Sequence, residues 1–462
     1  MNRRGFLTLS GATAASAAIA GTAGWVAASS PKPIELKIQQ ARYKFRDTAT
    51  ENMVSLSPDA PPPVVRMRQG EPFRANVTNT LADASAMHWH GIRVPNEMDG
   101  VPYLTQWPIE QGETWHYAYT SEDAGTYWYH PHCMTMDQIA RGLTGVLVVD
   151  ERRDPGFDAE TILNLRDFRI GDDGQFLQLY SARRAARSGT LGTVMTANWE
   201  QNPVYNHAPG AIVRLRVAAT DTTRIYRLAL EGGEGRILAA DGHPLRQALA
   251  WPTPDQPIIL APGQRLDIAV LMPKEEDQDV VLSHVSARGA RPLATLRTQG
   301  ASLSRMPGDI PDLPPNDVPD ADPASSEVVE LVFGWSPDGL KPDNGICGTL
   351  GYTFWSINRT PWPGDAVEGT GPLAELRLGK SYVLRMRNES PNMHPIHLHG
   401  LVFRPIQSNQ REVISNWTDT IVLAKNEIVD VLVVADNPGD WAFHCHVIEH
   451  QKTGLGGYIR VV

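Results

Sequence analysis

An internal repeat constrains the fold of this 462-residue chain more than any other feature. Three pairs of segments match at nearly constant spacing: residues 70–79 with 379–388, His88-Trp89-His90-Gly91 with His397-Leu398-His399-Gly400, and His130-Pro131-His132 with His444-Cys445-His446. The first two pairs lie 309 residues apart (379 minus 70) and the third lies 314 apart (444 minus 130). The first and last thirds of the chain are therefore expected to be copies of one structural unit.

The middle third keeps part of the pattern but lacks the paired histidines. Residues 263–273 echo the segments that begin at Gly112 and Asn426. Residues 301–326 crowd Pro with Asp and show no periodicity, which is typical of a linker. We expect an N-terminal leader followed by a chain of four parts: a histidine-bearing domain over 31–152, a spacer domain over 153–300, the linker over 301–326, and a second histidine-bearing domain over 327–462.

Short alternating segments predict an all-β protein. Residues 72–77, 213–217 and 384–387 alternate apolar with polar side chains and are cut by Gly, Pro or Asn turns, as half-buried strands are. Glycine and proline together make 75 residues (39 plus 36), which favours many turns over long helices. The repeat then predicts three similar β-sandwich or Greek-key domains.

Residues 1–30 differ from the rest of the chain. Arg3-Arg4 precedes Phe6-Leu7 and a weakly apolar run free of acidic residues, which resembles a twin-arginine export signal; the alternative is an Ala-rich disordered tail. The formal charge of −10 is scattered and makes nucleic acid an unfavourable partner. No later apolar run reaches the length of a membrane span. We expect a soluble, exported, periplasmic protein.

Ten of the fourteen histidines fall in four short motifs. These motifs are His88-Trp89-His90, His130-Pro131-His132, His394-Pro395-Ile396-His397-Leu398-His399, and His444-Cys445-His446 with His450 after it. On a strand, residues i and i+2 share one face, so each His-x-His pair offers two imidazoles to one patch. A single pair could be a stray zinc site, but four pairs at repeat-related positions predict one shared metal cluster.

Cys445 lies between His444 and His446, so its thiolate is expected to point away from their cluster. His394 and His450 are the imidazoles left over from the pairs. One thiolate with two imidazoles is the blue-copper arrangement, whereas a structural zinc site usually has more thiolates. Cys445 is thus predicted to join two metal sites.

With these motifs the chain resembles the three-domain multicopper oxidases, which include laccases and bacterial cuprous oxidases, over nearly its whole length after residue 30. The resemblance implies three cupredoxin-like Greek-key barrel or sandwich domains and four copper ions. It places type 1 copper on His394, Cys445 and His450, and type 2 copper on His88 and His397. It assigns the two type 3 coppers to His90, His130 and His446, and to His132, His399 and His444.

The resemblance also implies roles for residues near the copper sites. Leu455 occupies the axial position, and because leucine has no donor atom the type 1 potential is expected to be raised. Asp99 matches an acid used during O2 reduction, although it also suits a turn. Gln451 stands where related enzymes often have Glu, which puts one proton path in doubt, and we do not transfer that role to Glu449.

Three cysteines are too few for a disulfide framework. Cys133 and Met134 are interpreted as packing residues rather than a copper entry point, and the sequence does not decide whether Cys133 pairs with Cys347. The other histidines are predicted to be structural: His116, His207, His243 and His284.

Several functions remain open at this stage. No Met-rich insertion lies between residues 300 and 440, so an open substrate face and laccase-like oxidation of phenols or aromatic amines with O2 are favoured. A cuprous oxidase is the alternative. A copper-free envelope scaffold would lose the eleven donors, and a nitrite reductase would not need His444 and His446 at a trinuclear site. We expect a monomer that acts on a small reductant and O2.

Overall fold

The computed structural model describes residues 32–337, 347, 350–362 and 371–462, so the predicted export signal at residues 1–30 lies outside it. Strands dominate this part of the chain, and its α-helices are short: α1 (Thr135–Ala140), α2 (Ala182–Ala185) and α3 (Ile448–Gln451). The expected all-β class is confirmed. Within the described ranges, every helix is too short or too polar to cross a membrane.

Two four-stranded sheets form the first part of the chain, in the orders β2-β1-β4-β6 and β3-β8-β7-β5. Their strands are β1 (Ile34–Tyr43), β2 (Thr50–Ser55), β3 (Val65–Arg68), β4 (Pro72–Asn79), β5 (His88–His90), β6 (Thr114–Thr120), β7 (Gly125–His130) and β8 (Gly145–Asp150). A 3₁₀ turn, η1 (Asn96–Met98), follows β5. Strand β4 alternates buried and more exposed residues, as the sequence pattern predicts.

The middle part contains a six-stranded sheet, β10-β9-β12-β17-β14-β15, and a five-stranded sheet, β11-β19-β18-β13-β16. Their strands are β9 (Ala159–Phe168), β10 (Val194–Ala197), β11 (Val204–His207), β12 (Ile212–Ala219), β13 (Tyr226–Glu231), β14 (Glu234–Ala240), β15 (His243–Ala250), β16 (Ile258–Leu260), β17 (Arg265–Leu271), β18 (Asp279–Ser286) and β19 (Gly289–Thr298). These sheets have their own apolar cluster between Leu163 and Leu296.

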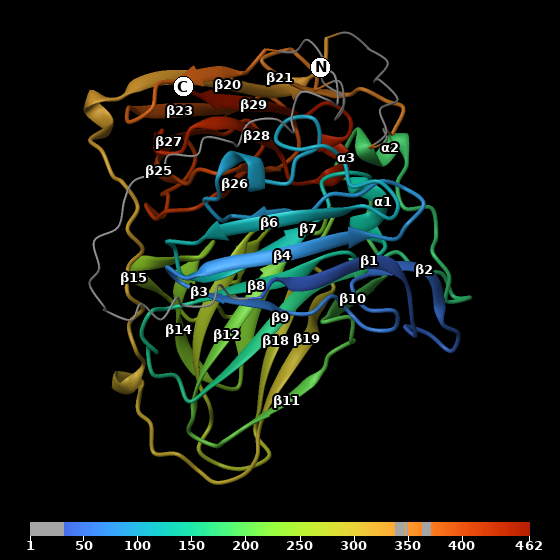
Figure 1. Ribbon diagram of the computed structural model, residues 1–462. Coiled ribbons are helices and arrows are strands. Elements are labelled where there is room, and N and C mark those ends of the chain that lie inside the picture. The colour runs from blue at the N-terminus through green and yellow to red at the C-terminus, as the bar shows by residue number, and fades with distance from the viewer. Residues whose placement is uncertain (1–31, 338–346, 348–349, 363–370) are drawn as a thin grey trace, which may run out of the picture. The chain divides into compact units, whose positions relative to one another are not determined.

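The last part again contains two sheets, β21-β20-β23-β27-β25 and β22-β29-β28-β24-β26. Their strands are β20 (Glu327–Trp335), β21 (Trp355–Ile357), β22 (Ala374–Leu376), β23 (Ser381–Asn388), β24 (His394–Leu398), β25 (Phe403–Ser408), β26 (Thr420–Leu423), β27 (Ile428–Val434), β28 (Gly439–Cys445) and β29 (Gly456–Val461). Figure 1 shows the three groups of strands in blue to teal, green to yellow, and orange to red. Buried apolar residues of the first and last groups belong to one continuous cluster.

Strand β12 corrects one expectation from the sequence. Residues 213–217 were expected to form a half-buried strand, but every residue of β12 is buried. Arg214 and Arg216 leave water because each meets carboxylates: both pair with Asp267, at 2.6 and 3.0 Å, and Arg216 also pairs with Glu160 at 2.6 Å. Charged side chains are buried when they are paired in this way.

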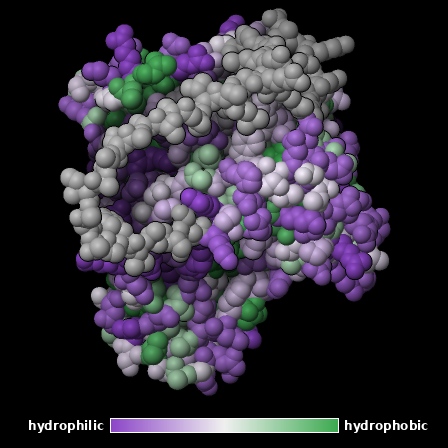
Figure 2. All heavy atoms as spheres, in the orientation of Figure 1, coloured by the Kyte–Doolittle hydropathy of each residue, from purple (hydrophilic) through white to green (hydrophobic). Residues whose placement is uncertain are grey.

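The segment predicted to be a linker, residues 301–326, contains no strand and only two 3₁₀ turns, η2 (Pro307–Asp309) and η3 (Pro323–Ser325). It nevertheless binds the strands that it passes: Asn316 exchanges hydrogen bonds with the backbone of Ala124, and Asp320 pairs with Arg246 and Arg404. On the face seen in Figure 2, hydrophilic side chains cover most of the described surface and apolar ones form small separate patches.

Candidate metal centre

Two equivalent strand pairs carry the histidine motifs. In the first, β5 pairs with β7 and places His88 opposite His130. In the second, β24 pairs with β28 and places His397 opposite His444. His397 and His444 are the repeat partners of His88 and His130, so the same ladder occurs once in each copy. Because side chains alternate along a strand, each ladder directs its His-x-His pairs to one face.

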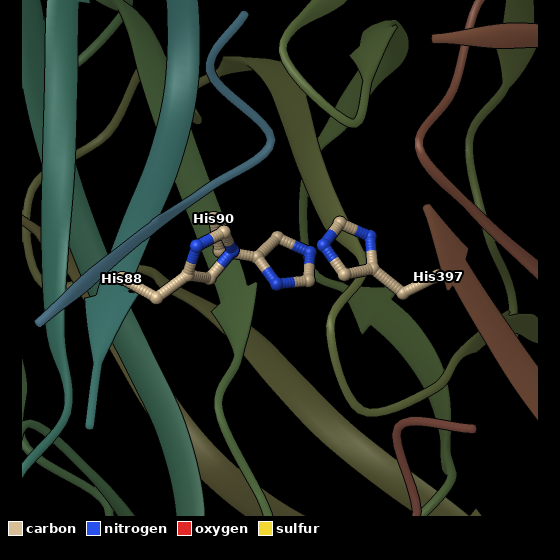
Figure 3. A group of neighbouring side chains, drawn as sticks. All are labelled: His88, His90 and His397. Carbon is tan, nitrogen blue, oxygen red and sulfur yellow. The ribbon is translucent and has the colours of Figure 1, made fainter. Parts of the chain in front are cut away.

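The structure collects the histidines into tight, buried groups whose ligand atoms lie within 4.8 Å of one another. Three groups hold the His-x-His motifs: His88 with His90 and His397; His90 with His130 and His446; and His132 with His399 and His444. A fourth group contains His394, Cys445 and His450. In Figure 3, His88 and His397 approach from opposite sides, with His90 beside them. Three of these groups contain the residue sets that the family resemblance implies for single coppers, and the first adds His90 to the implied pair of His88 and His397.

The imidazoles are oriented as metal ligands require. His88 Nδ1 donates to the carbonyl oxygen of Asp99 at 2.7 Å, and His130 Nδ1 faces that of Pro131 at 3.1 Å, which leaves each Nε2 directed inward. Within the described chain, several buried ring nitrogens of the cluster have no hydrogen-bond partner: His88 Nε2, His90 Nδ1, His130 Nε2, His132 Nδ1, His397 Nε2 and both nitrogens of His446. Buried polar atoms normally have partners, so these inward-facing nitrogens fit a group of metal ligands.

Burial also selects the ligating protonation state. Desolvation is the largest cause that lowers the pKa of nine motif histidines: His90, His130, His132, His394, His397, His399, His444, His446 and His450. Their imidazoles are therefore neutral at neutral pH, and neutral imidazole is the form that binds a metal.

Asp99 lies in the cluster, at the C-terminal end of η1. Its side chain is fully buried, and its Oδ2 accepts a hydrogen bond from His399 Nδ1 at 2.9 Å while its carbonyl oxygen holds His88. Asp99 therefore links a histidine of the first copy to a histidine of the last.

Asp419 makes the corresponding link from the opposite copy, and the sequence analysis missed it. Its carbonyl oxygen accepts from His397 Nδ1 at 2.9 Å, and its Oδ1 accepts from His90 Nε2 at 3.1 Å. The two aspartates thus repeat one arrangement across the cluster. A signal was present: Asn96-Glu97-Met98-Asp99 and Asn416-Trp417-Thr418-Asp419 share an Asn-x-x-Asp pattern after each His-x-His-Gly. The distance from the second histidine differs, nine residues against twenty, which hid the match.

The middle part of the chain reaches the cluster as well, so a role limited to setting spacing is wrong. Arg265, at the start of β17, is fully buried and pairs with Asp419 at 2.6 Å. Gly263 has φ of +93°, and a Cβ there would lie 3.1 Å from the ring of His446 and 3.2 Å from that of His90. A side chain at position 263 would press on two cluster histidines and adopt a strained backbone conformation.

The group around Cys445 lies on the other side of β28. The Sγ atom is 3.6 Å from Nδ1 of His394 and 3.6 Å from Nδ1 of His450. The indole of Trp355 contacts both rings, with centroid distances of 5.0 and 4.9 Å. Burial raises the pKa of the Cys445 thiol, so a bound cation is needed to hold the thiolate at neutral pH.

Comparisons with known proteins identify the family. Residues 37–154 and 348–462 match two family models, each described as multicopper oxidase. The crystal structure of a multi-copper oxidase from Pseudomonas thermotolerans is 37% identical to this chain, with a TM-score of 0.83 over 93% of this chain and 99% of that one. The chain belongs to the multicopper oxidase family.

Curated relatives of this oxidase agree with that result. Multicopper oxidase MmcO of Mycobacterium tuberculosis is 29% identical over 436 residues, which cover 86% of this chain and 80% of the relative. Laccase-1 of Botryotinia fuckeliana is 25% identical over 443 residues, which cover 86% and 76%. The family implies copper, and a donor set of imidazoles with one thiolate suits it.

Three further residues of the oxidase lie close to these groups. Leu455 is fully buried, and its carbonyl oxygen accepts from the backbone N–H of Cys445 at 3.0 Å. Gln451 Nε2 lies 3.5 Å from His132 Nε2. Glu449 is also buried, and its carboxylate accepts hydrogen bonds from the backbone N–H and the hydroxyl of Thr190.

The oxidase contains a disulfide between Cys133 and Cys347. Cys133 directly follows His132, so the interpretation of Cys133 as a packing residue is incomplete: it packs beside Ala84 and Ala86 and is also a covalent link. The sequence left this pairing open because 214 residues separate the two cysteines. The remaining histidines lie outside the groups and have other polar neighbours: His116 near Asn76, His207 near Thr161, His243 near Asn316 and His284 near Arg227.

The expected open substrate face is covered at the Cys445 group. His394 and His450 are both fully buried. His450 Nε2 donates to the carbonyl oxygen of Arg187 at 2.5 Å, and His394 Nε2 lies 2.7 Å from Ser390 Oγ. The chain lacks a Met-rich insertion, but these imidazoles are still not exposed. A segment of the middle part, which includes Arg187, covers them.

Proposed function

We propose that this multicopper oxidase is a laccase-type enzyme that holds four copper ions and couples oxidation of small aromatic donors to reduction of O2. The observation that carries the proposal is the set of buried, inward-facing imidazole nitrogens without partners, next to a separate group of one thiol and two imidazoles. Cys445 belongs to one group, and its chain neighbours His444 and His446 belong to the other. This arrangement suits transfer of single electrons from the first site to the cluster. The proposal includes three cupredoxin-like domains with the boundaries given above.

The residues that would hold the metal are the eleven motif donors. His394, Cys445 and His450 would hold the type 1 ion, and His88 with His397 the type 2 ion. His90, His130 and His446 would hold one type 3 ion, and His132, His399 and His444 would hold the other. Bound copper would supply one-electron redox chemistry and reduce O2 to two waters.

The chain's own residues complete the site. Cys445 and its neighbours His444 and His446 form a short covalent path between the two groups. Asp99 is placed to hold or release a proton beside His399, and Gln451 can hydrogen-bond but cannot donate a proton as an acid would. Leu455 has no donor atom to offer a copper ion held by this group, and the lack of a further donor would raise the reduction potential of that ion.

A cuprous oxidase is the second candidate, because a net charge of −10 attracts cations. A copper-free scaffold is disfavoured because all eleven donors are present and brought together. The predicted leader at residues 1–30 supports an exported, periplasmic enzyme, and we propose a monomer.

Metal analysis and O2 uptake test the function together. Four coppers per chain are expected, whereas two would indicate a nitrite-reductase-like protein and none a scaffold. O2 consumption with a phenol is then measured with and without a chelator of Cu(I). Uptake that persists with the chelator supports direct oxidation of the phenol, and uptake that occurs only with added copper supports a cuprous oxidase.

A further inference from the structure

The type 1 group is covered by one segment of the middle part, residues 182–190. The carbonyl oxygen of Arg187 accepts from His450 Nε2 at 2.5 Å, and that of Ala185 accepts from Trp355 Nε1 at 2.8 Å. Thr190, at the end of the segment, binds Glu449. Figure 1 shows α2 beside α3. Because His450 is fully buried, an electron donor that reaches this side of the site meets the segment before the imidazole.

This covering segment carries three exposed arginines close together in the sequence. Arg183, Arg184 and Arg187 are exposed, and in the described part of the chain none of them lies within ion-pair distance of a carboxylate. By contrast, Arg141 and Arg224 pair with Asp137 and Asp167.

Neighbouring charges show how concentrated this charge is. Partial burial and then repulsion from Arg184 lower the pKa of Arg169, which places a fourth guanidinium nearby. Glu449 interacts electrostatically with Arg184, but it is buried and its carboxylate accepts a hydrogen bond from Thr190. The protein as a whole carries a formal charge of −10, so the exposed arginines of this segment are opposite in sign to the overall charge.

We propose that Arg183, Arg184 and Arg187 form a docking surface for anionic aromatic donors, such as phenols that bear a carboxylate or sulfonate, and that this surface disfavours Cu(I) and cationic amines. The inference rests on the proposed function. Positive charge at the point of electron entry concentrates anions and repels cations before any contact forms. Guanidinium groups also form bidentate hydrogen bonds to carboxylate and sulfonate oxygens and stack on aromatic rings.

The redox balance of the proposal is simple. Each phenol gives up one electron and loses its hydroxyl proton to water, forming a phenoxyl radical that leaves. Four such oxidations match the four electrons and four protons that convert one O2 into two waters. The backbone of Arg187 and its hydrogen bond to His450 provide the path from the docked donor.

A charge-selectivity experiment on the copper-loaded enzyme tests this surface. The double variant Arg183→Gln/Arg187→Gln keeps the backbone carbonyl that holds His450, and Arg288→Gln, in the β18–β19 turn, removes another exposed arginine as the matched control. For a phenol carboxylate and its neutral methyl ester, we expect the ratio of the two kcat/KM values to fall about 10-fold in the double variant and to stay within about twofold of wild type in the control.

A second readout does not depend on turnover. Binding of naphthalenedisulfonate, a redox-inert dianion, is measured by calorimetry at low and high salt; its Kd should rise about fivefold or more in the double variant. An unchanged selectivity ratio together with unchanged dianion binding overturns the docking surface while leaving the oxidase function intact. Absence of O2 uptake with either donor in the wild-type enzyme overturns the proposed function itself, and this inference with it.

Discussion

Arg265 and Asp419 form a bidentate ion pair in which both side chains are fully buried. The guanidinium NH1 donates to Oδ1 at 2.9 Å and NH2 donates to Oδ2 at 2.6 Å. The same carboxylate accepts from His90, and the same arginine donates to the carbonyl oxygen of Gly263. One ion pair therefore ties the first, middle and last parts of the chain together at the histidine cluster.

Removing the arginine should be costly. Arg265→Met leaves Asp419 buried without its partner, so we expect the free energy of unfolding to fall by about 3–5 kcal/mol. Arg265→Lys keeps the positive charge but cannot make both hydrogen bonds to the carboxylate, so it should recover only part of the lost free energy. Arg152→Gln removes one partner of an exposed pair with Glu122 and should cost less than about 1 kcal/mol. Denaturant unfolding measures all three; equal losses for Arg265→Met and Arg152→Gln would contradict the importance of the buried pair.

Asp99→Asn tests the proton role of this residue. The amide keeps the size of the side chain and can still accept from His399, but it cannot hold or release a proton. We expect steady-state turnover to fall about 10- to 100-fold with little change in copper content. Glu97→Gln, an exposed neighbour, is the control and should retain wild-type turnover. Full activity in Asp99→Asn removes Asp99 from the mechanism.

Leu455→Met tests the axial position. A thioether there would donate weakly to the type 1 copper and stabilise Cu(II), so the reduction potential should fall. Voltammetry of the wild-type and variant enzymes measures the difference directly. An unchanged potential would mean that Leu455 only packs the site.

The disulfide should contribute strongly to stability. Cys133 and Cys347 close a loop of 214 residues in the unfolded chain, and links across long loops stabilise proteins by about 2–5 kcal/mol. Cys133→Ser/Cys347→Ser should lower the free energy of unfolding by this amount and so lower the midpoint of denaturant unfolding. A thiol reductant should lower the midpoint of the wild type but not that of the variant. Equal midpoints for wild type with and without reductant would contradict this role.

Copper-free protein should lose stability as the pH falls. Burial lowers the pKa of the buried motif histidines below the unfolded value of about 6.5, and it lowers the pKa of His450, in the Cys445 group, to about 4. The unfolded chain then binds more protons between these two values, so stability is highest above pH 6.5 and declines toward pH 4. Denaturant midpoints across this range should show the decline in the copper-free protein and a smaller one after copper loading. A flat profile for the copper-free protein would be inconsistent with neutral buried imidazoles.

The strand ladders explain why much of the site was predictable. A His-x-His motif on a strand sends both imidazoles to one face whatever surrounds it, and the repeat indicates that a second ladder supplies the other half. The grouping of His394 and His450 with Cys445 followed from these local rules and the family resemblance, whereas the place of His90 beside His88 and His397 did not. Strands β4, β12 and β23 were likewise predictable from their alternation.

Long-range pairing lay beyond local patterns. The burial of β12 depends on carboxylates from other strands, Asp419 reaches His90 only after the two copies meet, and Cys133 finds Cys347 across 214 residues. The cover of His450 by Arg187 is similar, since it comes from a part of the chain that carries none of the paired histidines. By itself the sequence determined the all-β class and which side chains can bind a metal, because periodicity and donor chemistry are local. Only the tertiary structure decided which residues hydrogen-bond to these side chains, pair with their carboxylate partners and cover them. Those contacts join residues that lie far apart in the sequence at no regular spacing.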